Sequence, residues 1–257
     1  MRINLTKQKL KNGETVFGTA LQHFRSAEIP RVYAAAGFDY FFIDLEHGSL
    51  DLETTQDIIA ASVAAGVTPL VRPAELLYSL IARMLDLGAQ GIVLPRVEDP
   101  EVLREALSWM TFPPHGKRGF GVSPALFDYE PLGFPEIMKR QDEHILTVVQ
   151  FETKTALERA DELLSVPGID VAMVGPADLS ISLGMPGDVE NREFVETVMA
   201  FMAKCQRHGV APGIHSRNVE GAKPWVARGM KLIGAGGEFS MFLERARQVA
   251  AEIRSAT

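Results

Sequence analysis

The chain has 257 residues, of which 46% are hydrophobic and 23% charged, and its formal net charge is −7. This balance, with no basic stripe, argues against nucleic acid or an anionic membrane as a partner. No apolar run reaches the roughly 18 residues of a membrane helix. The first residues lack a signal-peptide core, and a single cysteine, Cys205, excludes an internal disulfide. We therefore expect a cytoplasmic enzyme.

Eight short apolar runs recur along the chain, and each precedes a turn and an amphipathic helical pattern. As predicted strands they are VFGTAL (16–21), YFFID (40–44), TPLVR (68–72), GIVLPR (91–96), ILTVVQ (145–150), VAMVG (171–175), APGIH (211–215) and KLIGAG (231–236). Glycines follow several helical patterns at the position typical of a helix C-cap, namely Gly37, Gly66, Gly88, Gly209 and Gly229.

This alternation predicts one α/β domain over residues 1–257, a TIM (β/α)8 barrel. Continuous apolar strands separated by helices indicate a parallel sheet buried on both faces, and eight such units in about 250 residues are typical of this fold. A doubly wound open sheet is the alternative, but it usually has fewer strands, and no GxGxxG turn follows the first strand. Residues 112–144 are expected to form a long loop between strands four and five, as lids or interface elements do.

Polar residues collect at the carboxyl ends of the predicted strands, where TIM barrels hold their chemistry. The opposite ends hold residues typical of an ordinary surface. The collected residues are Asp44, Glu46 and His47 after the second strand, Arg72 after the third, Arg96 after the fourth, Gln150 and Glu152 after the fifth, Asp178 after the sixth and His215 after the seventh. We expect one polar site at this face.

Several of these residues also have a purely structural explanation. Asp178 precedes a helix and fits a capping role as well as a binding role. Glu152 alone is better explained by an ion pair with Lys154 or Arg159. His47 alone fits a loop hydrogen bond, and Arg72 fits a structural ion pair. These explanations lose weight because the residues fall at the same end of successive strands.

Two carboxylates from neighbouring strands, Glu152 and Asp178, suggest a site for a hard divalent cation such as Mg²⁺ or Mn²⁺. Arg72 carries a permanent charge suited to a developing enolate oxygen. His47 can exchange a proton near neutral pH, with Asp44 or Glu46 to orient it. Together these groups predict that a 2-oxo acid binds the metal and is converted to its enolate.

Segments of the chain resemble, in order, the HpcH/HpaI aldolases, which are metal-dependent class II pyruvate aldolases. They are FFIDLEHGSLD, VRPAE, DLGAQGIVLPRVE, KRGFG, VVQFET and VGPADLSISLG, and the resemblance spans roughly residues 14–245. It implies a (β/α)8 barrel, a divalent metal (Mg²⁺ or Mn²⁺, with Co²⁺ possible) and a homo-hexamer built as a trimer of dimers. It also implies cleavage of a 4-hydroxy-2-oxo acid to pyruvate and an aldehyde, and the reverse addition.

The resemblance also implies roles for individual residues. Glu152 and Asp178 match metal ligands, and Arg72 matches the arginine on the oxo-acid oxygen. His47 matches a proton carrier, with Asp44 as its partner. The other matches are Gln150 in the substrate pocket, the backbone of Gly175, Pro176 and Ala177 in a carboxylate cradle, and Asp86 as an acid that reaches a neighbouring subunit's site.

The chain departs from the sugar-acid members of the family where the aldehyde binds. It has EHGSL instead of EHAPN, its first loop lacks a tryptophan, and His215 replaces a common apolar residue. His215 fits either a contact with a polar aldehyde or a loop hydrogen bond. An oxaloacetate decarboxylase, or another enolate-based enzyme that forms C–C bonds, is the alternative function. A barrel without activity ranks last, because every expected catalytic position is filled.

Overall fold

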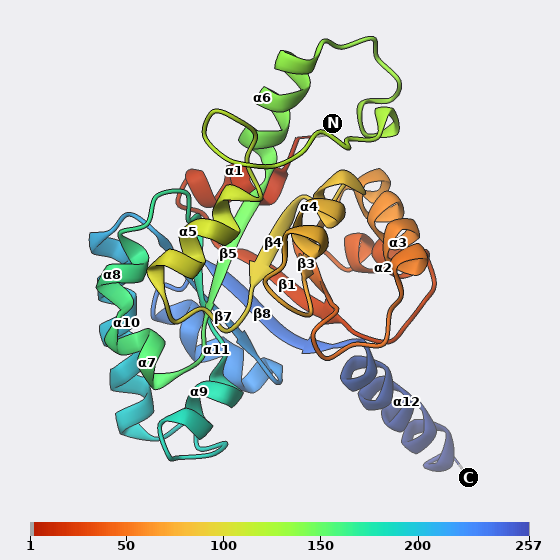
Figure 1. The fold of residues 1–257 in the computed structure, drawn as a ribbon. Coiled ribbons are helices and arrows are strands. Elements are labelled where there is room, and N and C mark those ends of the chain that lie inside the picture. Colours follow the sequence, from red (N-terminus) through yellow and green to blue (C-terminus); the bar gives the residue numbers. More distant parts are fainter. Residues whose placement is uncertain (1–2, 257) are drawn as a thin grey trace.

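The computed structural model describes residues 3–256 and confirms the TIM barrel (Figure 1). Its eight parallel strands pair in chain order, and the last closes on the first. The strands are β1 (Val16–Leu21), β2 (Tyr40–Asp44), β3 (Thr68–Arg72), β4 (Gly91–Leu94), β5 (Leu146–Phe151), β6 (Val171–Val174), β7 (Ala211–Ser216) and β8 (Leu232–Gly237).

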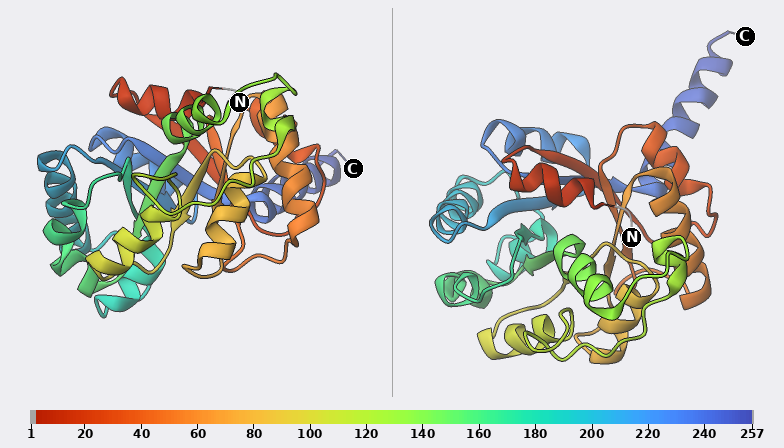
Figure 2. Two further views of the ribbon diagram at one scale, coloured as in Figure 1. Left: turned by 45° about the horizontal axis from the view of Figure 1, so that its top comes forward. Right: turned by 90° about the horizontal axis from the view of Figure 1, so that it is seen from above.

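Helices surround this barrel and follow its strands (Figures 1 and 2). They are α1 (Leu5–Lys11), α2 (Ile29–Ala35), α3 (Leu52–Ala65), α4 (Tyr78–Asp86), α5 (Pro100–Ser108), the 3₁₀ turn η1 (Pro124–Phe127), α6 (Phe134–His144), α7 (Lys154–Glu158), α8 (Ala160–Leu164), α9 (Pro176–Ser182), α10 (Arg192–Arg207), α11 (Val219–Ala227) and α12 (Glu238–Arg254). None of the helices within residues 3–256 combines the length and apolarity that a bilayer crossing requires.

The strand predictions hold to within two residues at each end. The largest difference is at β4, which ends at Leu94 rather than at Arg96. Arg96 has a φ of 53°, so the chain has already turned out of the sheet there. The predicted cap glycines are confirmed by positive φ angles, from 69° at Gly209 to 103° at Gly88.

Side chains alternate along each strand between the barrel interior and the helical coat. The interior cluster includes Tyr40, Phe42, Leu70 and Val148, whereas Phe41, Ile43, Val71 and Val149 belong to the outer cluster. Continuing this alternation along β2, β3 and β5 places the polar residues that end these strands on the interior side. The barrel is therefore filled with apolar side chains below and with polar side chains at its carboxyl end.

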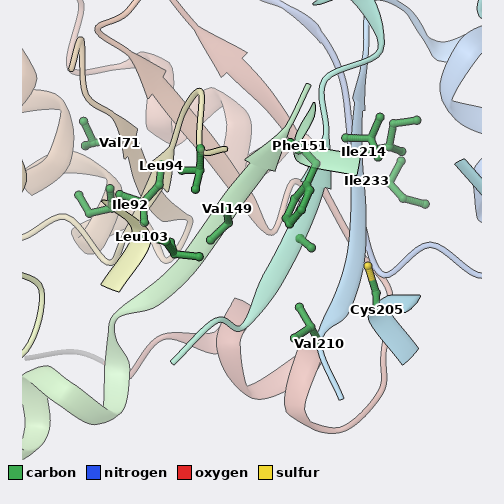
Figure 3. Close-up of a cluster of buried hydrophobic side chains, with 14 of the residues drawn as sticks. Val71, Ile92, Leu94, Leu103, Val149, Phe151, Cys205, Val210, Ile214 and Ile233 are labelled. Carbon is green, nitrogen blue, oxygen red and sulfur yellow. The ribbon is translucent and has the colours of Figure 1, made fainter. Parts of the chain in front are cut away.

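The outer cluster lies between the strands and the helices (Figure 3). It includes Val149 of β5, Ile214 of β7 and Cys205 of α10. Cys205 is buried, and burial raises the pKa of its thiol to about 12. This packed layer fixes the strand ends on which the site is built.

The segment 112–144 differs from the predicted long loop. It contains η1 and the eleven-residue helix α6, and its own small apolar cluster is centred on Phe112 and Phe127. It joins α5 to the start of β5, so it lies at the amino ends of the strands, near α1 (Figures 1 and 2). It therefore does not cover the carboxyl-end face of its own barrel.

Helix α12 projects away from the barrel instead of packing along it (Figures 1 and 2). Large apolar side chains on it are exposed, with exposed fractions of 65% at Phe242, 49% at Leu243 and 66% at Ile253. Its first turns lie against the barrel, where Phe239 and Phe242 contact the loop after β1.

Candidate active site

A hollow of about 440 Å³ opens at the carboxyl ends of the strands. Side chains from six strand ends line it, so the predicted polar face is a concave site. Of the predicted residues, the lining contains Asp44, Arg72, Gln150, Gly175, Pro176, Ala177, Asp178 and His215. Glu152 is buried directly behind this lining and His47 lies outside it.

Arg72 and Asp44 form a bidentate ion pair at the base of the hollow. They are register partners in the parallel pair of β2 and β3. Nε and Nη2 of Arg72 donate to the two carboxylate oxygens of Asp44 at 3.0 and 2.6 Å. Burial disfavours the charged carboxylate, but the hydrogen bond and charge of Arg72 outweigh it, so the pKa of Asp44 lies below its usual value.

Gln150 connects this pair to Glu152. Its Oε1 accepts a hydrogen bond from Nη1 of Arg72 at 3.3 Å, and its Nε2 donates to Oε2 of Glu152 at 2.5 Å. The other carboxylate oxygen of Glu152 accepts the backbone N–H of Arg96 at 2.9 Å. The positive φ of Arg96 presents this N–H to the site.

Glu152 is a buried carboxylate with negatively charged neighbours. Burial raises its pKa, and the negative charges of Glu46 and Asp178 add to this effect, while the N–H of Arg96 opposes it. Within residues 3–256, Glu152 forms no ion pair with Lys154 or Arg159. These two basic side chains pair with other acids. The structural explanation that competes with metal binding is therefore absent for this residue.

Asp178 lies in the first turn of α9, with its carboxylate facing the hollow. Gly175 is the N-cap residue, and Asp178 makes no capping hydrogen bond to this helix. A Cβ atom at Gly175 would lie 2.9 Å from Nε2 of Gln150 and 3.3 Å from the side chain of Glu152. Glycine thus allows the turn that carries Asp178 to approach Glu152 closely.

His47 lies at the rim, and Glu46 is the carboxylate beside its ring. The side chain of His47 is 51% exposed, and Nε2 lies 3.8 Å from Oε1 of Glu46. The expectation that Asp44 is the ring partner is not met, because Asp44 accepts only the backbone N–H of His47, at 3.2 Å. The carboxylate of Asp44 is turned toward Arg72 instead. Glu46 lies near the ring, while its carboxylate also pairs with Arg72 and Arg96.

His215 makes the loop hydrogen bond that was one of its two expected roles. Its Nε2 contacts the carbonyl oxygen of Gly236 at 3.0 Å, and its ring packs edge-on against Phe42 with 4.9 Å between centroids. The other ring nitrogen is buried without a partner among the described residues. Burial lowers the pKa of His215 to about 4, so the ring is neutral near pH 7.

Asp86 ends α4 at the amino end of the barrel, away from the hollow of its own chain. Its Oδ1 accepts a hydrogen bond from the buried guanidinium of Arg118 at 2.7 Å. The structure therefore does not bring it together with the other predicted site residues of the chain.

Gln22 and Glu238 are among the residues of the site that were not predicted. Gln22 follows β1 and lines the hollow, and Glu238 begins α12 and is 5% exposed. An acid directly after the last strand, in GAGGE, was a signal for Glu238. Gln22 carried no such signal, because a single amide after a strand is common on surfaces.

The residues present fit a divalent cation with two protein ligands. Within residues 3–256, no group of three or more His, Cys, Asp or Glu side chains has the arrangement of a complete metal site. Glu152 and Asp178 supply two hard oxygen ligands, which suits ions that keep waters and take substrate oxygens. Burial raises the pKa of Glu152, and the negative charge of Asp178 adds to this effect; a cation between the two carboxylates would relieve their repulsion.

A closed parallel barrel with a polar hollow at the carboxyl ends of its strands defines a TIM-barrel enzyme. The sequence model of HpcH/HpaI aldolase/citrate lyase matches residues 24–244. The 2-keto-3-deoxy-L-rhamnonate aldolase of Escherichia coli (strain K12) is 30% identical over 252 residues, which cover 98% of this chain and 94% of that protein.

Solved structures agree with this similarity. An HpcH/HpaI aldolase from Desulfitobacterium hafniense DCB-2 has a TM-score of 0.90 and 31% identity, with 96% of each chain covered. The citrate synthase SbnG has a TM-score of 0.83 and 27% identity, with 97% of this chain and 98% of that chain covered. The chain belongs to the HpcH/HpaI aldolase/citrate lyase family.

Proposed function

We propose that the chain is a divalent-metal-dependent aldolase that cleaves a 4-hydroxy-2-oxo acid to pyruvate and an aldehyde, and catalyses the reverse addition. The observation that carries this proposal is that Arg72 and Asp178 line one hollow, with Glu152 buried behind the lining and within electrostatic reach of both. The similarity to a 2-keto-3-deoxy-L-rhamnonate aldolase supports the same reaction class. No lysine lines the hollow within the described residues, so a Schiff-base mechanism has no support.

Glu152 and Asp178 would hold the metal, which we propose to be Mg²⁺ or Mn²⁺, with Co²⁺ also suited to such ligands. A divalent cation at this position supplies Lewis acidity toward the ketone oxygen of the substrate. Glu152 is already oriented for this role by the amide of Gln150 and the backbone N–H of Arg96.

Arg72 stabilises the enolate oxygen that develops when the C3–C4 bond of the substrate breaks. Its ion pair with Asp44 fixes the guanidinium plane, and the hydrogen bond to Gln150 fixes its free edge. The backbone N–H groups of Ala177 and Asp178, in the first turn of α9, lack intrahelical acceptors and are available to the substrate carboxylate.

His47 moves the proton. In cleavage it takes the proton of the C4 hydroxyl while the C3–C4 bond breaks, and the proton is returned to C3 of the enolate to give pyruvate. Glu46 lies 3.8 Å from its ring and stabilises the charged form that exists between these two steps.

A second candidate is an enzyme that uses the same enolate differently, such as an oxaloacetate decarboxylase or an enzyme that forms C–C bonds in biosynthesis. The likeness to the citrate synthase SbnG favours it. The pyruvate half of the hollow serves both reactions, so the ratio of kcat/KM for oxaloacetate to kcat/KM for hydroxy-oxo acids separates the two candidates.

We further propose a homo-oligomer, in the form of a hexamer built as a trimer of dimers. The support is the projecting helix α12 with its exposed apolar side chains. Asp86 lies at the far end of its own barrel, so its proposed role in a site requires a neighbouring copy. A cytoplasmic location stays a prediction.

The test of the proposed function is pyruvate enolisation followed by aldol addition. Purified protein is mixed with Mg²⁺ or Mn²⁺ and pyruvate in D₂O, and deuterium in the methyl group is followed by NMR. Aldehydes are then added and hydroxy-oxo acid products are measured. We expect metal-dependent exchange and at least one addition product. No exchange in a protein that binds the metal would refute the proposal.

A further inference from the structure

Glu238 is a buried carboxylate that holds the loop after β1. Its two oxygens lie 3.1 and 3.2 Å from the backbone nitrogen of Gln22. Oε1 also accepts the N–H groups of His23 at 2.6 Å and Phe24 at 3.3 Å. Three consecutive N–H groups therefore converge on one charged acceptor, which is a strong and directional anchor for this loop.

Aromatic contacts bind the same loop to the first turns of α12. The ring of His23 stacks on Phe239 with 5.0 Å between centroids. Phe24 meets Phe239 and Phe242 edge-on at 5.1 and 5.9 Å. The loop and the start of α12 thus form one packed unit at the rim of the hollow.

Gln22 carries this anchor to the catalytic ion pair. Its Nε2 donates to Oδ2 of Asp44 at 2.8 Å, and the same oxygen accepts Nη2 of Arg72 at 2.6 Å. The carbonyl oxygen of Gln22 accepts the N–H of Ser49 at 2.9 Å, in the loop that carries His47. Gln22 therefore connects the anchored loop to Asp44, which holds Arg72, and to the loop that carries His47.

We propose that Glu238 is a positioning residue of the reaction. By fixing Gln22 it orients Asp44, and through Asp44 it sets the guanidinium of Arg72 against the enolate oxygen. The same contacts couple α12 to the site, so whatever holds α12 also steadies the catalytic groups. This inference rests on the proposed aldolase function.

If Glu238 only anchored the loop, its substitution would change the stability of the fold and leave the reaction unaffected. A positioning residue that acts through Gln22 has two further consequences. Enolisation slows while metal binding is unchanged, because Glu238 contacts neither proposed ligand. The effects of changing Glu238 and Gln22 are also not additive, because both changes remove the same connection to Asp44.

The experiment is a double-mutant cycle read by deuterium exchange into pyruvate and by Mn²⁺ titration. The variants are Glu238→Gln, Gln22→Leu and the double variant, with Glu244→Gln on the exposed face of α12 as the control. We expect each single change to lower kcat for exchange about ten-fold or more. The double change should cost little beyond the larger single loss, and Mn²⁺ affinity should stay within about two-fold.

Exchange by Glu238→Gln at the wild-type rate would overturn the inference, as would losses that multiply in the double variant. If Glu238→Gln does not fold, the cycle is run with Glu238→Asp, which keeps the charge but shortens the reach to the three N–H groups. A wild-type protein without any exchange would instead refute the proposed function, because the inference concerns only the difference between variants.

Discussion

At the scale of single residues, the neutral ring of His215 makes stability depend on pH. Its pKa is about 4 in the folded chain, whereas a free histidine titrates near 6.5. Between these values the unfolded chain binds a proton that the folded chain does not. The contribution of the neutral His215 ring to the free energy of unfolding is therefore fully present above about pH 6.5 and is lost as pH falls toward 4.

We expect His215→Leu to reduce this pH dependence. The free energy of unfolding of the wild type should fall on the order of 1–3 kcal/mol more than that of the variant between pH 7 and pH 4. Urea unfolding at several pH values measures both slopes. Equal slopes would contradict the assignment of a buried neutral ring.

Arg217 is a charged residue that follows β7 and lines the hollow. Its side chain has no ion pair or hydrogen bond to another residue in the described part of the chain. A free cation beside the space left for the aldehyde should favour an acceptor with a negative charge.

We expect Arg217→Gln to lower kcat/KM about ten-fold for an aldehyde that ends in a carboxylate. In the same variant, kcat/KM for a neutral aldehyde of the same length should change less than two-fold. Arg217→Lys should retain part of the preference for the aldehyde with a carboxylate. Equal losses for both aldehydes would show that Arg217 does not select the acceptor.

At the scale of elements, Arg118 attaches the segment 112–144 to the barrel. It is 1% exposed, donates to Asp86 at 2.7 Å and to Gln141 at 3.0 Å, and lies 4.7 Å from the ring centroid of Phe112. Removing Arg118 would leave the carboxylate of Asp86 and the amide of Gln141 without the hydrogen bonds that this guanidinium donates.

We expect Arg118→Met to lower the free energy of unfolding by about 2–3 kcal/mol. Arg104→Gln is the matched control, because it removes an exposed arginine that also pairs with an acid, Glu101; its effect should be below about 1 kcal/mol. Chemical denaturation measures both, and comparable effects would mean that the buried pair contributes no more than a surface pair.

The sequence was sufficient to predict the elements where local signals agree. Apolar runs and cap glycines placed all eight strands, because a buried parallel strand has few alternatives. The helix α6 was missed because Pro and Gly dominate the segment before it. The projection of α12 was missed as well, since an amphipathic pattern predicts a buried face without saying what covers it.

The candidate site was predictable in its composition but not in its pairings. Polar residues after successive strands meet at one end of any such barrel, so Arg72, Gln150 and Asp178 were found together. Side-chain direction determines the rest. Asp44 serves Arg72 rather than the ring of His47 because β2 and β3 align them in register, and a linear sequence does not contain that register.

At the scale of the whole molecule, α12 is the element through which copies of the chain should associate. We expect a mass several times the 28.2 kDa of one chain in sedimentation analysis. Leu243→Asp with Ile253→Asp should lower this mass, because buried charges oppose apolar contacts. Arg247→Ser, on the same helix, should not. A monomeric wild type would refute the oligomer.

The central claim is that Glu152 and Asp178 bind one divalent cation per chain. Titration with Mn²⁺, followed by electron paramagnetic resonance of the free ion, tests it most directly, with Glu158→Gln as a control for the loss of an exposed acid in α7. We predict one site in the wild type and in the control. Glu152→Gln and Asp178→Asn should each weaken binding about 100-fold or more. Wild-type affinity in either variant would contradict the account.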